Sequence, residues 1–128
     1  MMEKNILIVD DEKFIRDMLE QAFSKEGYII RSAESAEEAL EILKDEKFQV
    51  MFLDLNLPKM NGVELCKQIR KDIPIGIIYA VTGYASLFEL ADCREAGFDD
   101  YFTKPVKLEM LFKAAQDAFE KIDRWKKR

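Results

Sequence analysis

The sequence contains no histidine among its 128 residues. This absence excludes a Ser-His-Asp triad, a histidine-ligated metal and any histidine acid–base role in this chain. A phosphorylated histidine would therefore have to come from a partner. Only two cysteines are present, Cys66 and Cys93, and they do not form a CxxC pair. Because both fall in apolar-periodic segments, we expect two reduced, partly buried thiols.

Long apolar runs are missing as well. The run ILIV near the N-terminus is too short for a signal-peptide core or a membrane span, so we expect a cytoplasmic protein with no membrane partner. Basic residues are not in excess: 20 Lys and Arg against 25 Asp and Glu give a net charge of −5. This acidic balance argues against direct nucleic-acid binding.

Repeats, low-complexity tracts and linkers are also absent from the sequence. A chain of 128 residues suits one compact domain with a substantial core. We therefore expect a single domain over 1–128, in which 123–128 form a basic helix end or tail.

Two patterns alternate along the chain. Short runs rich in Ile and Val predict strands at 5–9, 28–32, 50–54, 77–81 and 101–103. The segments between them have helical periodicity. Residues 12–26 place one apolar stripe on a helix, made of Phe14, Ile15, Met18, Leu19, Ala22 and Phe23. Ser35 with Glu38 predicts a capping box, and Gly27 and Gly97 stand where helices should end.

Five strands alternating with five helices predict an α/β fold with a single five-stranded parallel sheet covered on both faces. With right-handed crossovers, the leading arrangement is the doubly wound, flavodoxin-like order 2-1-3-4-5. In such sheets the functional crevice lies at the carboxyl ends of the strands, where the winding reverses. That point falls between the first and third strands.

Polar side chains occupy the predicted strand ends. The first strand ends in Asp10-Asp11, the third in Asp54, the fourth in Thr82 and the fifth in Lys104. Clustered carboxylates repel one another unless a cation joins them, and hard oxygen ligands suit magnesium. A divalent cation, a lysine and a hydroxyl around one carboxylate are suited to receive a phosphoryl group. Asp54 would then be the nucleophile and form an aspartyl phosphate.

Each of these residues also has a plainer interpretation. Asp10-Asp11 could be a helix N-cap, and Asp54 could be a turn residue that bonds its own backbone. Thr82 could be an ordinary strand-end residue, and Lys104 a solvated surface lysine. The coincidence of all of them at the ends of four strands favours the site.

With these motifs the sequence resembles the receiver domains of two-component response regulators. The resemblance covers essentially the whole chain and rests on Asp10-Asp11, the segment DLNLPKMNG, Thr82-Gly83 and Lys104-Pro105. It implies that Asp54 is the phospho-acceptor and that Lys104 pairs with the phosphoryl group. It also implies that Thr82 is the switch hydroxyl.

The resemblance further assigns a metal site and a switch. Asp11 and Asp54 match side-chain ligands of Mg²⁺ or Mn²⁺, with Asp10 assisting through water and Asn56 through its backbone carbonyl. Tyr101 matches the aromatic rotamer switch. The peptide bond before Pro105 is expected to be cis.

The implied function is a signalling switch. A partner histidine kinase or phosphotransfer protein would phosphorylate Asp54, and the face formed by the fourth helix, fifth strand and fifth helix (roughly 84–122) would change for a downstream protein or effector domain. The chain would catalyse only transfer to, and hydrolysis from, its own Asp54, so it is not expected to be an enzyme. Met110 and Ala114 stand where receivers with winged-helix partners carry Glu and Arg. That subfamily's salt-bridge dimer is therefore not implied, although another phosphorylation-dependent dimer stays open.

Other functions compete with this interpretation. A receiver-like module could bind partners without phosphorylation, but the complete site argues against it. A magnesium-dependent aspartyl-phosphate phosphatase needs an acid two residues after its nucleophile, where this chain has Asn56. A flavin protein could share the fold, but the carboxylate cluster would repel a flavin phosphate.

Overall fold

The computed structural model describes residues 3–83 and 87–126, and within 87–89 only the backbone. The parts of the expected switch face and basic tail at 84–86 and 127–128 lie outside the described residues. The elements follow one another as β1 (Asn5–Val9), α1 (Lys13–Lys25), β2 (Ile29–Ala33), α2 (Ala36–Asp45), β3 (Val50–Asp54), α3 (Gly62–Asp72), β4 (Ile77–Thr82), α4 (Leu87–Ala96), β5 (Asp100–Thr103) and α5 (Leu108–Lys126).

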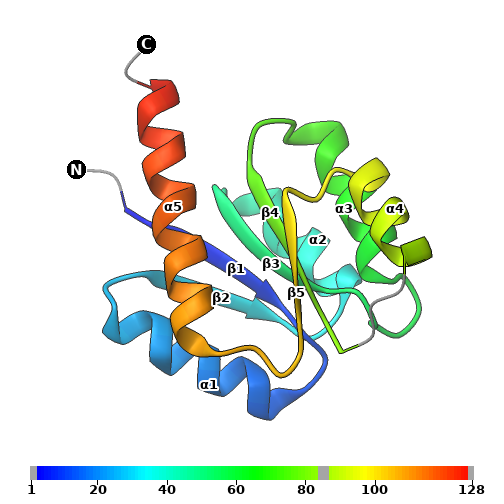
Figure 1. The fold of residues 1–128 in the computed structure, drawn as a ribbon, viewed down its shortest axis with the longest axis horizontal. Helices are drawn as coiled ribbons and strands as arrows, with labels where there is room; N and C mark the ends of the chain where they lie inside the picture. The colour runs from blue at the N-terminus through cyan, green and yellow to red at the C-terminus, as the bar shows by residue number, and fades with distance from the viewer. Residues whose placement is uncertain (1–2, 84–86, 127–128) are drawn as a thin grey trace.

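The strands form one parallel sheet in the order β2-β1-β3-β4-β5, as predicted (Figure 1). Every residue of the inner strands β3 and β4 is buried, which explains why both appear in the sequence as nearly unbroken apolar runs. The predicted bounds of β1 and β3 are correct. Those of β4 and β5 differ by one residue at one end, and β2 is shifted by one residue at both ends.

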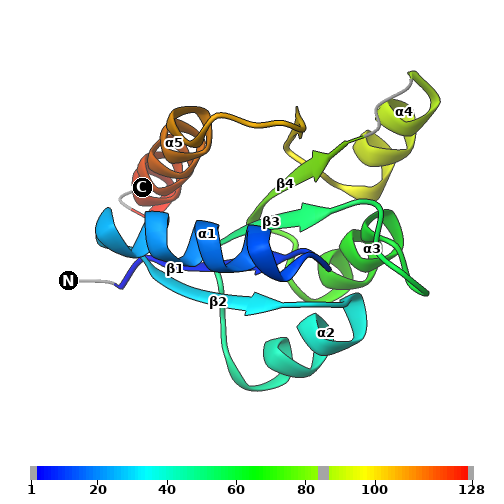
Figure 2. The same cartoon turned by 90° about the horizontal axis from the view of Figure 1, so that it is seen from below.

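Helices cover both faces of the sheet. In β1, Ile6 and Ile8 pack toward α1 and α5, whereas Leu7 and Val9 pack toward α2, α3 and α4 (Figures 1 and 2). This alternation follows from the two-residue period of a strand. The sheet therefore has a buried apolar layer on each face, and these layers leave the ends of the strands available for polar residues.

The apolar stripe predicted for α1 is too wide. Leu19 and Phe23 are buried, but Phe14 is 75% and Met18 is 36% exposed. The Phe23 ring contacts Phe112 of α5 at a centroid distance of 5.2 Å, so the partner helix covers the later turns of α1. Phe14 lies in the first turn, beyond that cover.

The helices before Gly27 and Gly97 end where predicted, whereas the capping box predicted for α2 is incomplete. Gly27 and Gly97 have φ values of +92° and +107°, which glycine adopts without steric cost. Ser35 is the N-cap of α2 and accepts a hydrogen bond from the Glu38 backbone N–H at 3.1 Å. Among the described contacts, the return bond from the Glu38 side chain is absent, so the predicted capping box is only half formed.

At the edge of the sheet where the strands begin, Arg70 connects two loops. Its guanidinium donates to the carbonyls of Gly97 at 2.7 Å and Gly76 at 2.6 Å, and it pairs with Asp99 at 2.9 Å. The Asp99 carboxylate also accepts the backbone N–H of Ile78 at 2.8 Å. One side chain thus joins the α3–β4 and α4–β5 loops.

Neither cysteine is in a disulfide, and both are fully buried rather than partly so, with 0% of Cys66 and 4% of Cys93 exposed. They lie on α3 and α4 within one apolar cluster. Within 3–83 and 87–126, no helix has both the length and the apolarity that crossing a membrane requires.

Candidate functional site

The sheet register brings the predicted site residues together. Val9 pairs with Leu53, so Asp10 and Asp54 follow on adjacent strands at the same level. Asp54 pairs in turn with Val81, which places Thr82 one residue further along β4. Asp10, Asp54 and Thr82 are the buried polar residues of the described chain, at 3%, 4% and 2% exposed. Because buried polar groups need partners, their surroundings define the site.

Lys104 lies between the two buried carboxylates. Its ammonium nitrogen is 3.0 Å from Asp10 Oδ2 and 3.3 Å from Asp54 Oδ2. Its backbone N–H donates to the Thr82 carbonyl at 2.7 Å, which fixes where the lysine leaves the sheet. The Lys104–Pro105 peptide bond is cis, as predicted. With a side chain only 22% exposed, Lys104 is not the solvated surface lysine of the plainer interpretation.

The charges at this point are strongly coupled. Burial raises the pKa of Asp54 above its ordinary value, against the Asn56 backbone N–H and the Lys104 ammonium, which lower it. Burial alone would lower the pKa of Lys104, but its hydrogen bonds and charge interactions with Asp10 and Asp54 raise it overall. The site therefore holds a protonated lysine beside a carboxylate whose charged form is costly to bury.

Asp54 uses its two oxygens differently. Oδ1 accepts the backbone N–H of Asn56 at 3.0 Å, so Asp54 does form the predicted turn with its own backbone, while Oδ2 faces Lys104. The loop then ends at Asn61, which forms a reciprocal capping box with Glu64 at the start of α3. Gly62 packs against the same loop: a Cβ there would lie 2.3 Å from the Asp54 carbonyl oxygen.

An acidic cluster follows β1. One carboxylate oxygen from each of Asp10, Asp11 and Glu12 lies within 4.8 Å of the others, and Asp11 and Glu12 are exposed. Asp10-Asp11 is not the cap of α1: the N-cap is Glu12, without a side-chain cap bond. Asp10 Oδ1 instead accepts the Glu12 backbone N–H at 2.9 Å. An all-oxygen donor set of this kind fits a hard divalent cation such as Mg²⁺.

The cluster differs from the predicted ligand set in two respects. It includes Glu12, which directly follows the acidic pair and is not among the predicted ligands. It does not include Asp54, whose Oδ2 is paired with Lys104. The two groups are nevertheless continuous, because Asp10 belongs to both.

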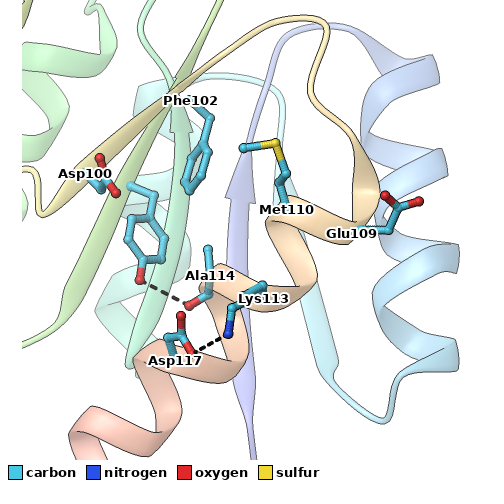
Figure 3. A pocket seen from close by; sticks show the side chains of 8 residues that line it. Asp100, Phe102, Glu109, Met110, Lys113, Ala114 and Asp117 are labelled. Carbon is cyan, nitrogen blue, oxygen red and sulfur yellow. Dashed lines mark hydrogen bonds and ion pairs between the residues drawn. The ribbon is translucent and has the colours of Figure 1, made fainter.

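Two hollows flank β5. One, of about 470 Å³, lies between β5 and α5, where Phe102 and Met110 point toward one another (Figure 3). Its rim carries Asp100, Glu109 and an ion pair between Lys113 and Asp117 at 3.5 Å. The other, of about 630 Å³, lies between α4 and β5 and is lined in part by Tyr101. Tyr101 itself is 37% exposed.

One contact at the site was not predicted. Arg16 of α1 donates from Nη1 to the backbone carbonyl of Asp10 at 2.8 Å, with only 14% of its side chain exposed. The sequence gives no signal for it, since Arg16 stands on a helix among other charged residues.

Comparison with known proteins agrees with this geometry. The family model described as the response regulator receiver domain matches residues 6–116. The transcriptional regulatory protein PhoP of Bacillus subtilis is 39% identical over 104 residues, which cover 81% of this chain and 43% of PhoP. The response regulator MprA of Mycobacterium ulcerans is 35% identical over 113 residues, covering 86% and 47%. The chain thus spans about half the length of these curated relatives.

Solved structures resemble the fold over nearly the whole chain. A CheY-like receiver domain from Methanospirillum hungatei has a TM-score of 0.85 at 35% identity and covers 94% of this chain and 99% of that one. A two-component response regulator from Clostridium difficile has a TM-score of 0.90 at 28% identity, covering 94% and 98%. Together with the family match and the site at the carboxyl end of the sheet, these likenesses show that the chain belongs to the response regulator receiver domain family of two-component systems.

Proposed function

We propose that this chain is a phosphorylation-driven switch in which Asp54 accepts a phosphoryl group. The observation that carries the proposal is the Lys104 ammonium between the buried carboxylates of Asp10 and Asp54. Burying two carboxylates is costly, and pairing them with one lysine leaves a net negative charge. Such a site is suited to exchanging charged groups rather than to stabilising the fold.

The phosphoryl donor is a histidine kinase or phosphotransfer protein, as membership of the family implies, because this chain has no histidine of its own. A carboxylate oxygen of Asp54 attacks the phosphorus, the P–N bond of the partner's phosphohistidine breaks, and the imidazole nitrogen keeps the electron pair. Lys104 offsets the negative charge near the reacting oxygens. Water later hydrolyses the acyl phosphate and restores Asp54, so the chain acts only on itself.

A divalent cation fits beside Asp54. Asp11 and Asp54 would hold Mg²⁺ or Mn²⁺ by their side chains, Asn56 by its backbone carbonyl and Asp10 through water. When bound, the cation supplies charge neutralisation for the phosphoryl oxygens. The oxygen-only chemistry of Asp10, Asp11 and Glu12 supports this assignment.

The proposed output runs through β5. A phosphoryl group on Asp54 draws Lys104 and the Thr82 hydroxyl toward its oxygens. The ring of Tyr101, which is 37% exposed, turns inward into the space that Thr82 leaves. Because β5 lies between the two hollows, this rotation reshapes the α4–β5–α5 face for a downstream protein or effector domain.

Intact-mass measurement after incubation with a small acyl phosphate tests the proposal. We expect one added phosphoryl group that requires both Mg²⁺ and Asp54, so Asp54→Asn should gain none. Asp45→Asn removes an exposed carboxylate and is the matched control, with normal phosphorylation. An unmodified wild-type protein, with a small donor and also with a phosphorylated histidine kinase, would instead favour a module that binds partners without phosphorylation.

A further inference from the structure

The turn that carries the acidic cluster has few supports of its own. Glu12 caps α1 without a side-chain bond, and Asp11 and Glu12 are exposed. Three contacts reach the turn from neighbouring elements, all at its first residue. The Asp10 N–H donates to the Ala33 carbonyl at 3.1 Å, Arg16 donates to the Asp10 carbonyl at 2.8 Å, and the Lys104 ammonium lies 3.0 Å from Asp10 Oδ2. The direction of the chain after β1 thus depends on Asp10.

Arg16 directs its charge mainly at that carbonyl. Its other contact is an ion pair with Glu34 at 3.9 Å, the limit for such a pair, and Glu34 is 66% exposed. A contact of this length to a solvated carboxylate contributes little. The mostly buried guanidinium therefore has the Asp10 carbonyl as its short, charge-assisted partner.

The carbonyl of Asp10 and the N–H of Asp11 belong to the same planar peptide unit. Holding that carbonyl fixes the orientation of the plane and so sets where the Asp11 side chain begins. Asp11 is one of the proposed cation ligands and has no helix cap or strand pairing to orient it. From these contacts we infer that Arg16 is a positioning residue, which orients the acidic cluster for a divalent cation without touching it.

A positioning role for Arg16 predicts a change in Mg²⁺ affinity opposite in sign to the change expected from its charge alone. Arg16 is a cation near a cation site, so if only its charge mattered, removing it would strengthen Mg²⁺ binding. If it positions the turn, removing it weakens binding, and partners of metal ligands typically change metal affinity by about tenfold or more. Arg16→Met removes the charge but keeps a long apolar stem, and Arg16→Lys keeps the charge but loses the planar fork.

Calorimetric titration with Mg²⁺ distinguishes a positioning role of Arg16 from a purely electrostatic one. We expect the dissociation constant of Arg16→Met to rise about tenfold and that of Arg16→Lys to rise by about threefold or more. Arg31→Met, which removes the same charge from an exposed ion pair with Glu46, should leave it unchanged. Unchanged or tighter binding in Arg16→Met would overturn the inference. If Arg16→Met does not fold, unchanged binding in Arg16→Lys would do so.

Phosphorylation by the acyl phosphate adds a second readout. In Arg16→Met, the Mg²⁺ concentration for half-maximal rate should rise, while the rate at saturating Mg²⁺ stays near wild type. A loss of rate at saturation would contradict a purely positioning role. The inference rests on the proposed cation site, yet the two fail differently. A wild-type protein that does not bind Mg²⁺ refutes both, whereas wild-type binding that Arg16→Met retains refutes the inference alone.

Discussion

Replacing Lys104 by methionine tests the electrostatics of the site most directly. At 3.0 and 3.3 Å, and with an effective dielectric constant of about 20, each contact of the ammonium with a carboxylate amounts to about 5 kcal/mol of Coulomb attraction. Desolvation offsets much of this in the intact protein. Removing one partner of a buried pair nevertheless costs about 3–5 kcal/mol, because the remaining charge stays buried.

Lys104 is 22% exposed, so we expect the lower end of this range, about 3 kcal/mol at neutral pH without Mg²⁺. For a domain of this size that is a fall of about 12 °C in Tm. The loss should shrink as the pH falls, because Asp54, whose pKa is raised by burial, then takes up a proton. Adding Asp54→Asn to the variant should recover part of the stability.

Urea and thermal unfolding, with a chelator present, measure these effects. Lys113→Met is the matched control: it removes the same charge from an exposed pair with Asp117 and should change the unfolding free energy by less than about 0.5 kcal/mol. If Lys104→Met proved as stable as this control at neutral pH, the ammonium would not hold the two carboxylates, and the electrostatic reasoning would be refuted.

Three further predictions concern neighbouring residues. Since burial raises the folded pKa of Asp54 above 3.8, the stability of the wild-type protein should fall as the pH rises through that folded value. The free energy of unfolding of Asp54→Asn in urea, relative to wild type, should therefore increase from acid to neutral pH. A difference that stays constant with pH would contradict this. Gly62→Ala should cost about 2–3 kcal/mol in thermal unfolding because its Cβ would meet the Asp54 carbonyl at 2.3 Å. Gly83→Ala should cost little, since among the described residues beyond its chain neighbours the nearest atom to the new Cβ is the Lys104 Cβ at 3.9 Å. Burial raises the pKa of Cys66 to about 12, so native protein at about pH 8 should resist thiol alkylation at this residue until it is unfolded; rapid labelling would argue against the buried thiol.

The sequence predicts the sheet well because its inner strands are buried on both faces. In β3 and β4 burial leaves no room for polar residues before the strand ends, so Asp54 and Thr82 mark those ends. Parallel topology then brings the ends to one edge. Lys104 is predictable because the parallel topology also brings the end of β5 to this edge. Its pairing with both Asp10 and Asp54, in contrast, requires coordinates.

Features that depend on meetings between distant segments could not be predicted. Periodicity gives the direction of the α1 stripe but not how far α5 covers it, so Phe14 lies on the predicted stripe and is nevertheless exposed. Arg70 bonds loops that meet only through the fold. Ser35 and Asn61 both begin helices, yet only Asn61 forms the reciprocal box, which depends on the rotamer of the glutamate three residues later.

The two outer strands determine how the molecule can associate. β2 and β5 are short, at five and four residues, and each has an exposed charged side chain, Arg31 and Asp100, beside exposed Ile29 and Tyr101. Long, flat and apolar edges invite further strands and aggregation, whereas these edges are short and carry exposed charges. Assembly by strand addition is thereby discouraged, which leaves the helical faces and the rim above the sheet, where we propose the phosphoryl transfer, as surfaces for partners.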